Sequence, residues 1–394
     1  MASCYLNTGA KKDCTGCGAC KAICPKNAIT MVSDEEGYKY PHIDTKKCIN
    51  CGLCRRICPV TNEIPDIYPK AYTYVTNDES NLFEATSGGA FGDIVNAVFE
   101  EGKTYVYGCT FDENHKAVHA GVNSREKINQ FKRSKYVQSD LKETFKEVRD
   151  LLAAGYKVIF SGTPCQTAGL KSFLKGDCAN LLCIDIICHG VPSQKLLDYY
   201  INIEEKKNNS KLNKIVFREK SKEKDGSYSL TNVKLFFSNG EKVLRKASKS
   251  SYMTGFSGRL FYRPSCYNCK FASKNRLSDI TICDIWGLKN LDKEIYGKGI
   301  SGIIINSAKG EEVLNKLNGI IKDIPIEHVI KTNECYTRPS YYNKNRNKFF
   351  NGLSESNFEK KAFKYAKKPL INRIILFPRK VLGYIKRFIL KCIK

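Results

Sequence analysis

The sequence CTGCGACKAICP at residues 14–25 recurs as CINCGLCRRICP at residues 48–59, 34 positions further along the chain. Each copy has three evenly spaced cysteines, a fourth cysteine four positions later and a proline directly after it. This pattern is typical of ferredoxin domains with two four-iron clusters, in which the fourth cysteine of each copy binds the cluster of the other copy. We therefore expect one cluster on Cys14, Cys17, Cys20 and Cys58, and a second on Cys48, Cys51, Cys54 and Cys24.

A pair of structural zinc sites is the alternative interpretation of the repeat, although such sites usually use two separated pairs of ligands. The chain has 394 residues, 19 cysteines and 42% hydrophobic residues, which is enough for a substantial core and two or three folding units. The N-terminus lacks an apolar stretch of the signal-peptide type, and no run is long enough to span a membrane. We expect a cytoplasmic, reducing location, where thiolates persist as metal ligands.

The formal net charge of +25 is concentrated at one end of the chain. Residues 359–394 contain 12 Lys or Arg against a single acidic residue, interleaved with Leu, Ile and Phe. A cationic amphipathic helix of this kind can lie on an anionic membrane surface. We therefore expect peripheral contact of this basic tail with the inner face of the membrane; a terminal helix that covers the domain is the alternative.

After the cysteine repeat and a proline-containing linker at 64–69, strand and helix periodicities alternate. Strands are expected at 71–75, 104–109, 157–161 and 181–187, and helices at 88–101, 140–154, 166–175 and from 192 onward. An Asn239-Gly240 turn between 230–237 and 242–245 predicts an antiparallel hairpin, so we expect a mixed sheet. Strands at 280–285 and 302–306 and a helix near 311–317 would complete an α/β domain.

Two short turns have the composition of anion-binding sites. Thr86-Ser87-Gly88-Gly89 precedes an amphipathic helix, and Ser161-Gly162-Thr163-Pro164 lies between a predicted strand and a predicted helix. Free N–H groups at a helix start attract anions, although each turn alone is more often just a cap. Two such turns in one α/β sheet indicate a phosphate-bearing cofactor.

Four further cysteines could close a third cluster: Cys165 in FSGTPCQ, Cys188 in IICHG, and Cys266 with Cys269 in RPSCYNCKF. Of these, the CxxC of Cys266 and Cys269 is metal-like by itself. A lone cysteine at a strand end is commonly a small buried hydrophobic residue, which is the alternative for each. The others are expected to be structural or free thiols: Cys4, Cys109, Cys178, Cys183, Cys335 and Cys392.

An ordered series of motifs resembles the beta subunit of the coenzyme F420 hydrogenase/dehydrogenase family over roughly residues 70 to 345. The series is TSGGAF (86–91), RSKYVQS (133–139), FSGTPCQ (160–166), ICHGVPS (187–193) and CYNCKFASKNRLSDITICDIWG (266–287). The resemblance implies a flavoprotein, normally with FAD, with a four-iron cluster near the flavin. A fused ferredoxin domain is known in the family.

The resemblance also implies individual site residues. Those expected against the flavin are Ser87, Gly88, Gly89, Ser134, Lys135, Tyr136, Gly162 and Thr163, and the cluster ligands are Cys165, Cys188, Cys266 and Cys269. As catalytic candidates we name Lys135, to stabilise an anionic reduced flavin, and His189, as a proton donor or a structural residue. The family usually has glycine where this chain has Cys283, which is either a packed substitution or an alternative ligand.

The expected fold is an α+β dicluster ferredoxin domain followed by a mixed-sheet α/β flavin-binding reductase domain. We place the ferredoxin domain at 1–67, the N-terminal and C-terminal regions of the beta subunit at 68–150 and 151–350, and the basic tail at 351–394. The leading hypothesis is an oxidoreductase that passes electrons between the clusters and a flavin, with a redox partner protein or ferredoxin on one side. A small-molecule substrate, or coenzyme F420 itself, would react on the other side.

Two alternatives belong to other classes. One is an electron-transfer subunit of a larger complex with no substrate of its own. The other is a zinc-dependent nucleic-acid binder, which the net charge suggests and which a brown, flavin-containing protein would rule out. We expect no nucleic acid among the partners.

Overall fold

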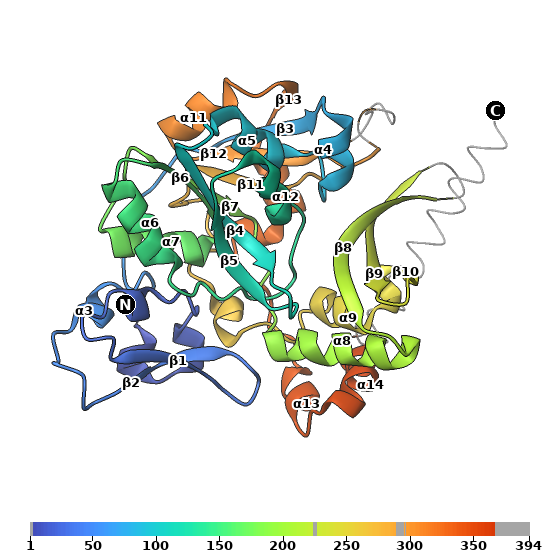
Figure 1. The fold of residues 1–394 in the computed structure, drawn as a ribbon, viewed down its shortest axis with the longest axis horizontal. Helices are drawn as coiled ribbons and strands as arrows, with labels where there is room; N and C mark the ends of the chain where they lie inside the picture. The colour runs from blue at the N-terminus through green and yellow to red at the C-terminus, as the bar shows by residue number, and fades with distance from the viewer. Residues whose placement is uncertain (1–2, 224–226, 289–294, 296, 367–394) are drawn as a thin grey trace.

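The computed structural model describes residues 3–223, 227–288, 295 and 297–366 (Figure 1). The N-terminal part contains α1 (Tyr5–Thr8), η1 (Lys11–Asp13), α2 (Ala19–Ala22), the antiparallel strands β1 (Ile29–Ser33) and β2 (Lys39–Ile43), and α3 (Leu53–Arg56). In both cysteine repeats a glycine with left-handed φ precedes the short helix, Gly18 at 74° and Gly52 at 72°. Glycine tolerates this conformation without strain, so the two repeats fold alike.

An eight-stranded mixed sheet forms the centre of the larger part of the molecule, with strand order β13-β3-β12-β11-β7-β6-β4-β5. Its strands are β3 (Lys70–Thr76), β4 (Thr104–Phe111), β5 (Ala117–Val122), β6 (Lys157–Gly162), β7 (Leu181–Ile186), β11 (Ile280–Asp284), β12 (Ser301–Ile305) and β13 (Gly319–Ile324). The neighbours β4, β6, β7 and β11 run parallel, and the other pairs are antiparallel. The carboxyl ends of the four parallel strands therefore meet at one edge of the sheet.

Both faces of this sheet are covered. Ile159 packs with α5 (Ala90–Val98) and α11 (Ala308–Leu314), whereas its neighbours Val158 and Phe160 pack with α6 (Thr144–Ala153) and α7 (Pro164–Leu174). Other short elements here are α4 (Glu79–Glu84), η2 (Arg125–Phe131), η4 (Pro264–Asn268), α12 (Ile326–Thr332) and η5 (Glu334–Tyr336). The mixed α/β fold is confirmed.

A second, three-stranded sheet curves beside α8 (Gln194–Asn208) (Figure 1). It consists of β8 (Leu212–Lys222), β9 (Tyr228–Phe237) and β10 (Lys242–Arg245), and it is packed by η3 (Ala247–Lys249), α9 (Ser251–Ser257), α13 (Arg346–Phe350) and α14 (Glu355–Tyr365). The hairpin at Asn239-Gly240 is confirmed, with Gly240 at φ 86°. Its assignment to the main sheet was wrong, because Val233, Leu235 and Phe237 build a separate core with Leu196 and Tyr200 of α8.

The predicted strands and helices of the main sheet are found within a few residues of their expected bounds. The helix expected at 88–101 is shorter, because Gly89 takes a left-handed φ of 90° and Phe99 is extended. The helix expected at 140–154 begins at Thr144, because Asp140 pairs with Val118 beside β5. Sequence periodicity missed β1, β2, β5, β8 and β13.

Part of the predicted basic tail is a packed helix. Phe358 and Ala362 of α14 are fully buried against the α8 and α9 core, and Lys207 of α8 pairs with Glu359 at 2.5 Å. Residues 367–394 lie outside the described residues, so the predicted membrane contact stays a prediction. Among the described residues, no helix has the length and apolar character needed to cross a bilayer.

Candidate active site at the sheet edge

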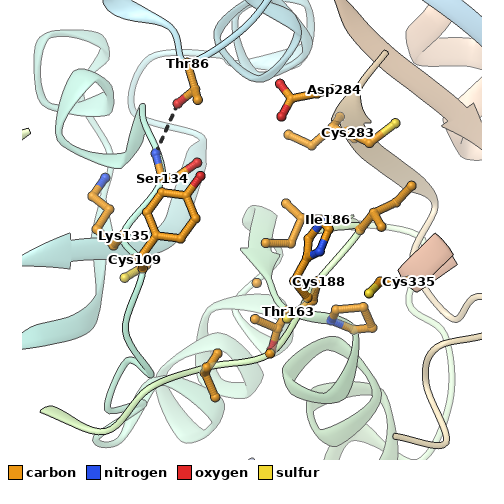
Figure 2. A pocket seen from close by; sticks show the side chains of 18 of the residues that line it. Thr86, Cys109, Ser134, Lys135, Thr163, Ile186, Cys188, Cys283, Asp284 and Cys335 are labelled. Carbon is orange, nitrogen blue, oxygen red and sulfur yellow. Dashed lines mark hydrogen bonds between the residues drawn. The ribbon is translucent and has the colours of Figure 1, made fainter. Parts of the chain in front are cut away.

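A cavity of about 660 Å³ lies at the carboxyl ends of β4, β6, β7 and β11. This volume is in the range of small-molecule and cofactor sites, and the edge of parallel strands is where α/β proteins commonly bind ligands. Figure 2 shows Ser134 and Lys135 on one wall and Cys283 and Asp284 across from them. The cavity therefore collects residues from five well-separated segments of the chain.

The turn at 161–166 forms one wall and is fixed from below by a hydrogen-bond network. Thr163 caps α7, with its backbone N–H donating to the side-chain oxygen of Gln166 at 2.9 Å and Pro164 in the first helical turn. Gln166 in turn donates to Ser139 Oγ, and Ser139 bonds His119 Nδ1, both at 2.9 Å. The predicted strand-to-helix turn is confirmed, and Gly162 and Thr163 line the cavity.

His119 closes this network as a neutral imidazole. Its Nε2 donates to Ser161 O at 3.0 Å, which leaves Nδ1 to accept from Ser139, and burial lowers the pKa of His119 to about 4. The unfolded chain takes up this proton near pH 6.5, so it binds more protons than the folded chain between pH 6.5 and 4. Stability contributed by neutral His119 is thus present above pH 6.5 and lost as the pH falls toward 4.

We expect this loss to be about 3 kcal/mol of unfolding free energy in total. In His119→Gln, which keeps a donor and an acceptor but does not titrate, denaturant unfolding between pH 7 and 5 should show a smaller loss of stability than in the wild type. The control is His42→Gln, because His42 is exposed on β2. An equal pH dependence in wild type and His119→Gln would contradict the assignment.

The loop at 85–89 and the segment at 133–136 form the opposite wall. The Ser134 N–H donates to Thr86 Oγ1 at 3.2 Å (Figure 2), and Ser87 Oγ donates to Ile300 O at 2.7 Å. Ser87, Gly89, Ser134, Lys135 and Tyr136 line the cavity. Gly88 does not, because it is pressed against the backbones of β3 and β12, where a methyl group would lie 2.2 Å from Tyr74 O.

Positive charge dominates the cavity wall. The cations that line it are Lys132, Arg133, Lys135, Arg218, Arg259 and Arg276, and the carboxylate that lines it is Asp284. Arg218 forms an ion pair with Asp284, and its guanidinium lies 5.7 Å from the Trp286 ring centroid. An excess of Lys and Arg suits a ligand with phosphate groups. Apart from Lys135, sequence reasoning did not single out these cations, because they come from separate segments without a shared motif.

The two catalytic candidates lie in this wall in different settings. Lys135 Nζ donates to Gln130 O at 2.8 Å and Lys132 O at 2.6 Å, and burial lowers the pKa of Lys135 to about 8. Burial also lowers the pKa of His189, whose backbone carbonyl accepts from Ser340. Both line the cavity, and their catalytic roles stay predictions.

The four cysteines of the predicted third cluster all line the same cavity. Cys165 is in the first turn of α7, Cys188 follows β7, and Cys266 and Cys269 are in and directly after η4. Burial raises the pKa of Cys165 to about 11 and that of Cys266 to about 12, and the charge of Cys269 raises both further. The pKa of Cys188 is raised by burial and then by the other three cysteines. The four thiols are therefore mutual neighbours.

Among the described residues, no three Cys, His, Asp or Glu side chains are arranged to hold a single metal ion. Four thiols around a hollow match the donor set of a four-iron cluster, which needs thiolates on several sides of a cubane. A cluster would displace the thiol protons that burial retains. Cys109, Cys283 and Cys335 line the cavity as well, so Cys283 keeps both of its interpretations.

A second group of thiols lies directly behind Cys165. Burial raises the pKa of Cys20, and the charges of Cys17, Cys14 and Cys58 raise it further, so these four predicted ligands of the first cluster are neighbours. Cys17 also interacts electrostatically with Cys165. A methyl group on Gly169 of α7 would lie 2.9 Å from Cys17 Cβ, so this glycine permits the close approach.

The predicted ligands of the second cluster lie farther from the cavity. Of these, Cys51 is exposed, and Cys48, Cys54 and Cys24 are half-buried. The Ala28 N–H donates to Cys24 Sγ at 3.3 Å, which is the kind of backbone contact that tunes a cluster sulfur. The two predicted sets thus run from the exposed side of the N-terminal part toward the cavity.

Comparison with known proteins agrees with this architecture. The family model for the C terminus of the coenzyme F420 hydrogenase/dehydrogenase beta subunit matches residues 155–328, and a 4Fe-4S dicluster domain model matches residues 13–62. Among solved structures, a chain of the F420-reducing [NiFe] hydrogenase complex from Methanosarcina barkeri, studied by xenon derivatization, is similar, with 17% identity and a TM-score of 0.43. That similarity covers 77% of this chain and 93% of the other. A search of curated proteins finds no match.

A dicluster domain joined to an α/β domain with a cavity at its sheet edge defines an iron–sulfur electron-transfer protein. The chain belongs to the coenzyme F420 hydrogenase/dehydrogenase beta subunit family and carries the dicluster domain in the same polypeptide. The family resemblance and the fold class expected from the sequence are thereby confirmed.

Proposed function

We propose that this protein is an iron–sulfur flavoprotein oxidoreductase that passes electrons between its dicluster domain and a flavin in the cavity. When bound, the clusters supply one-electron carriers and the flavin supplies the link to two-electron chemistry. The observation that carries the proposal is the contact between the two cysteine groups: Cys17 of the first set lies against α7, which begins at the cavity with Cys165.

The cysteine groups define the proposed route through the protein. Cys51 of the second set is exposed, where a partner protein can approach, and Cys20 and Cys58 of the first set are half-buried next to Cys17. The remaining set, Cys165, Cys188, Cys266 and Cys269, opens into the cavity. A redox protein such as a ferredoxin would exchange electrons at the exposed end, and the flavin at the buried end.

The cavity walls have distinct proposed tasks. Ser87, Gly89, Ser134, Lys135, Tyr136, Gly162 and Thr163 would contact the flavin, with FAD favoured because the surrounding arginines can bind its phosphates. Gly88 would act indirectly, by holding the 85–89 loop on the sheet. Lys135 would place positive charge where reduction adds negative charge, and His189 would exchange a proton with the substrate. Coenzyme F420 or another small organic molecule is the proposed substrate.

Anaerobic purification with iron, sulfide and flavin measured on one sample tests this proposal. We expect about twelve iron atoms and about one flavin for each chain, with absorption bands of both groups. About eight iron atoms with flavin would remove the third cluster from the proposal. A colourless or zinc-loaded preparation without flavin would overturn the proposal as a whole.

A further inference from the structure

One arginine connects the two cysteine groups. Arg263 lies three residues before Cys266 and is 1% exposed, and its backbone N–H donates to Val191 O, three residues after Cys188. Its guanidinium extends into the N-terminal part, where Nε donates to Cys14 O at 2.7 Å and an Nη donates to Lys39 O at 2.8 Å. The side chain therefore begins beside the third cysteine group and ends beside the first.

The position of the guanidinium is fixed on every side. Its other Nη donates to Gln138 Oε1 at 3.1 Å, and Gln138 in turn donates to Thr15 O at 2.9 Å. The Tyr40 ring centroid lies 4.4 Å from the guanidinium carbon, and that of Tyr38 lies 5.6 Å away. Within the described residues, Arg263 has no carboxylate within ion-pair distance. Neutral groups thus hold a buried cation in one place.

The thiols are the groups that balance this charge. Burial opposes the charged form of Arg263, but the thiolates of Cys14 and Cys266 and the Tyr40 hydroxyl favour it, and the net effect raises the pKa of Arg263. In return, Arg263 favours the thiolate form of Cys165 and Cys266. A buried and unpaired cation is costly, so its retention here indicates a negative group nearby.

We propose that Arg263 is a positioning residue whose fixed positive charge lies between the first and third clusters and raises the reduction potential of both. The inference rests on the proposed function, since it requires clusters in both cysteine groups. Each cluster gains one negative charge on reduction, and a buried cation stabilises that charge more strongly than water-screened surface charges do. Arg263 would thereby hold electrons at the junction between the dicluster domain and the cavity.

The test is a potentiometric titration of the anaerobically purified full-length protein, followed by electron paramagnetic resonance. For Arg263→Gln we expect the equilibrium constant for one-electron reduction to fall about tenfold at both clusters, a shift of about 59 mV to lower potential. Arg263→Lys retains the charge and should recover at least half of the shift. Gln138→Glu retains Arg263 but puts a carboxylate against it, so it should lower both potentials even if Arg263→Gln fails to fold.

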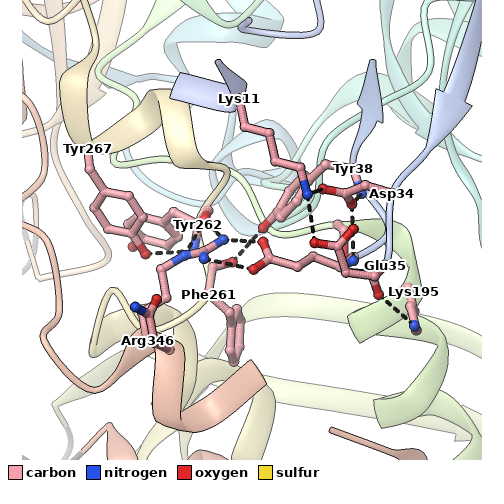
Figure 3. Close-up of polar contacts among 12 residues, drawn as sticks. Lys11, Asp34, Glu35, Tyr38, Lys195, Phe261, Tyr262, Tyr267 and Arg346 are labelled. Atoms are coloured by element: carbon pink, nitrogen blue, oxygen red, sulfur yellow. Dashed lines mark hydrogen bonds and ion pairs between the residues drawn. The ribbon is translucent and has the colours of Figure 1, made fainter. Parts of the chain in front are cut away.

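Arg346 provides the matched control. It is also buried, forms an ion pair with Glu36 of the N-terminal part and donates to Tyr262 O, and Figure 3 shows it beside Tyr262 and Tyr267. Its charge acts on the hydroxyls of Tyr38 and Tyr267, whereas Arg263 is the arginine that acts on the Cys266 thiol. Arg346→Gln should therefore weaken the contact between the two parts without changing either potential.

The outcomes separate the two proposals. Unchanged potentials in a foldable Arg263→Gln or in Gln138→Glu, with about twelve iron atoms retained, would overturn the role of Arg263 alone. Equal shifts in Arg263→Gln and Arg346→Gln would also overturn it, because they would reflect loosened packing. Fewer than about twelve iron atoms in the wild type would instead contradict the proposed function.

Discussion

Replacing Cys165 with serine is expected to remove the third cluster and to stop electron transfer between the dicluster domain and the flavin. Cys165 is buried in the first turn of α7 and lies between Cys17 and the other three cysteines of the cavity. The iron content should fall from about twelve to about eight atoms, while the eight cysteines of the repeat retain their clusters. Flavin reduction by electrons delivered to the dicluster domain should slow by at least about a hundredfold, because the direct connection is lost.

Stopped-flow absorbance that follows the iron–sulfur and flavin bands separately measures this result. Cys335→Ser is the control, because Cys335 is also buried and lines the cavity but is not one of the proposed ligands. It should keep about twelve iron atoms and the rate of the wild type. Full iron content and a normal rate in Cys165→Ser would exclude Cys165 as a ligand.

Replacing Gly88 with alanine is expected to destabilise the protein by about 3 kcal/mol and to weaken flavin binding. The added methyl group would lie 2.2 Å from Tyr74 O of β3 and 2.6 Å from Ser301 N of β12. Both are backbone atoms of central strands and cannot move without breaking the sheet. The 85–89 loop would have to lift, and Ser87 and Gly89 would leave the cavity wall with it.

Denaturant unfolding and fluorimetric flavin titration of the same variant measure the two effects. Gly162→Ala is the control for stability, because its methyl group would meet the Phe160 ring at 3.0 Å and the Gln166 side chain at 3.2 Å. Side chains can shift by a few tenths of an ångström, so the loss should be under about 1 kcal/mol. If Gly88→Ala were as stable as the wild type, the loop would not be held by its contact with the sheet.

Much of the fold could be predicted because the local signals agreed with the tertiary environment. The strands β4, β6 and β7 are short apolar runs bounded by turns, and α7 has a proline in its first turn. The edge strand β5 escaped notice because AVHAGV carries neither a continuous apolar run nor a strong alternation. The β8 strand escaped for a related reason, since Lys and Arg alternate with its apolar residues beside a separate core.

The candidate site divides in the same way. Spacing alone indicated the eight repeat cysteines, and the matching dicluster model confirms the class of domain, while the individual ligands and the domain limits at 67, 150 and 350 stay predictions. Motif resemblance predicted that Ser134, Thr163 and Cys188 share one site, and all three line the same cavity. No sequence pattern connected His119 with Gln166, or Arg263 with Cys14, because each pair joins segments that meet only after folding.

By itself, the sequence determined the chemistry available to this protein: regularly spaced thiols, glycines at left-handed positions and helix starts that follow parallel strands. These depend on contacts within a few residues, so they can be seen in one dimension. The tertiary structure decided where that chemistry meets. It put Cys17 against Gly169, pressed Gly88 onto the sheet and buried Arg263 between two cysteine groups. Such choices depend on close packing between distant segments, for which local spacing carries no information.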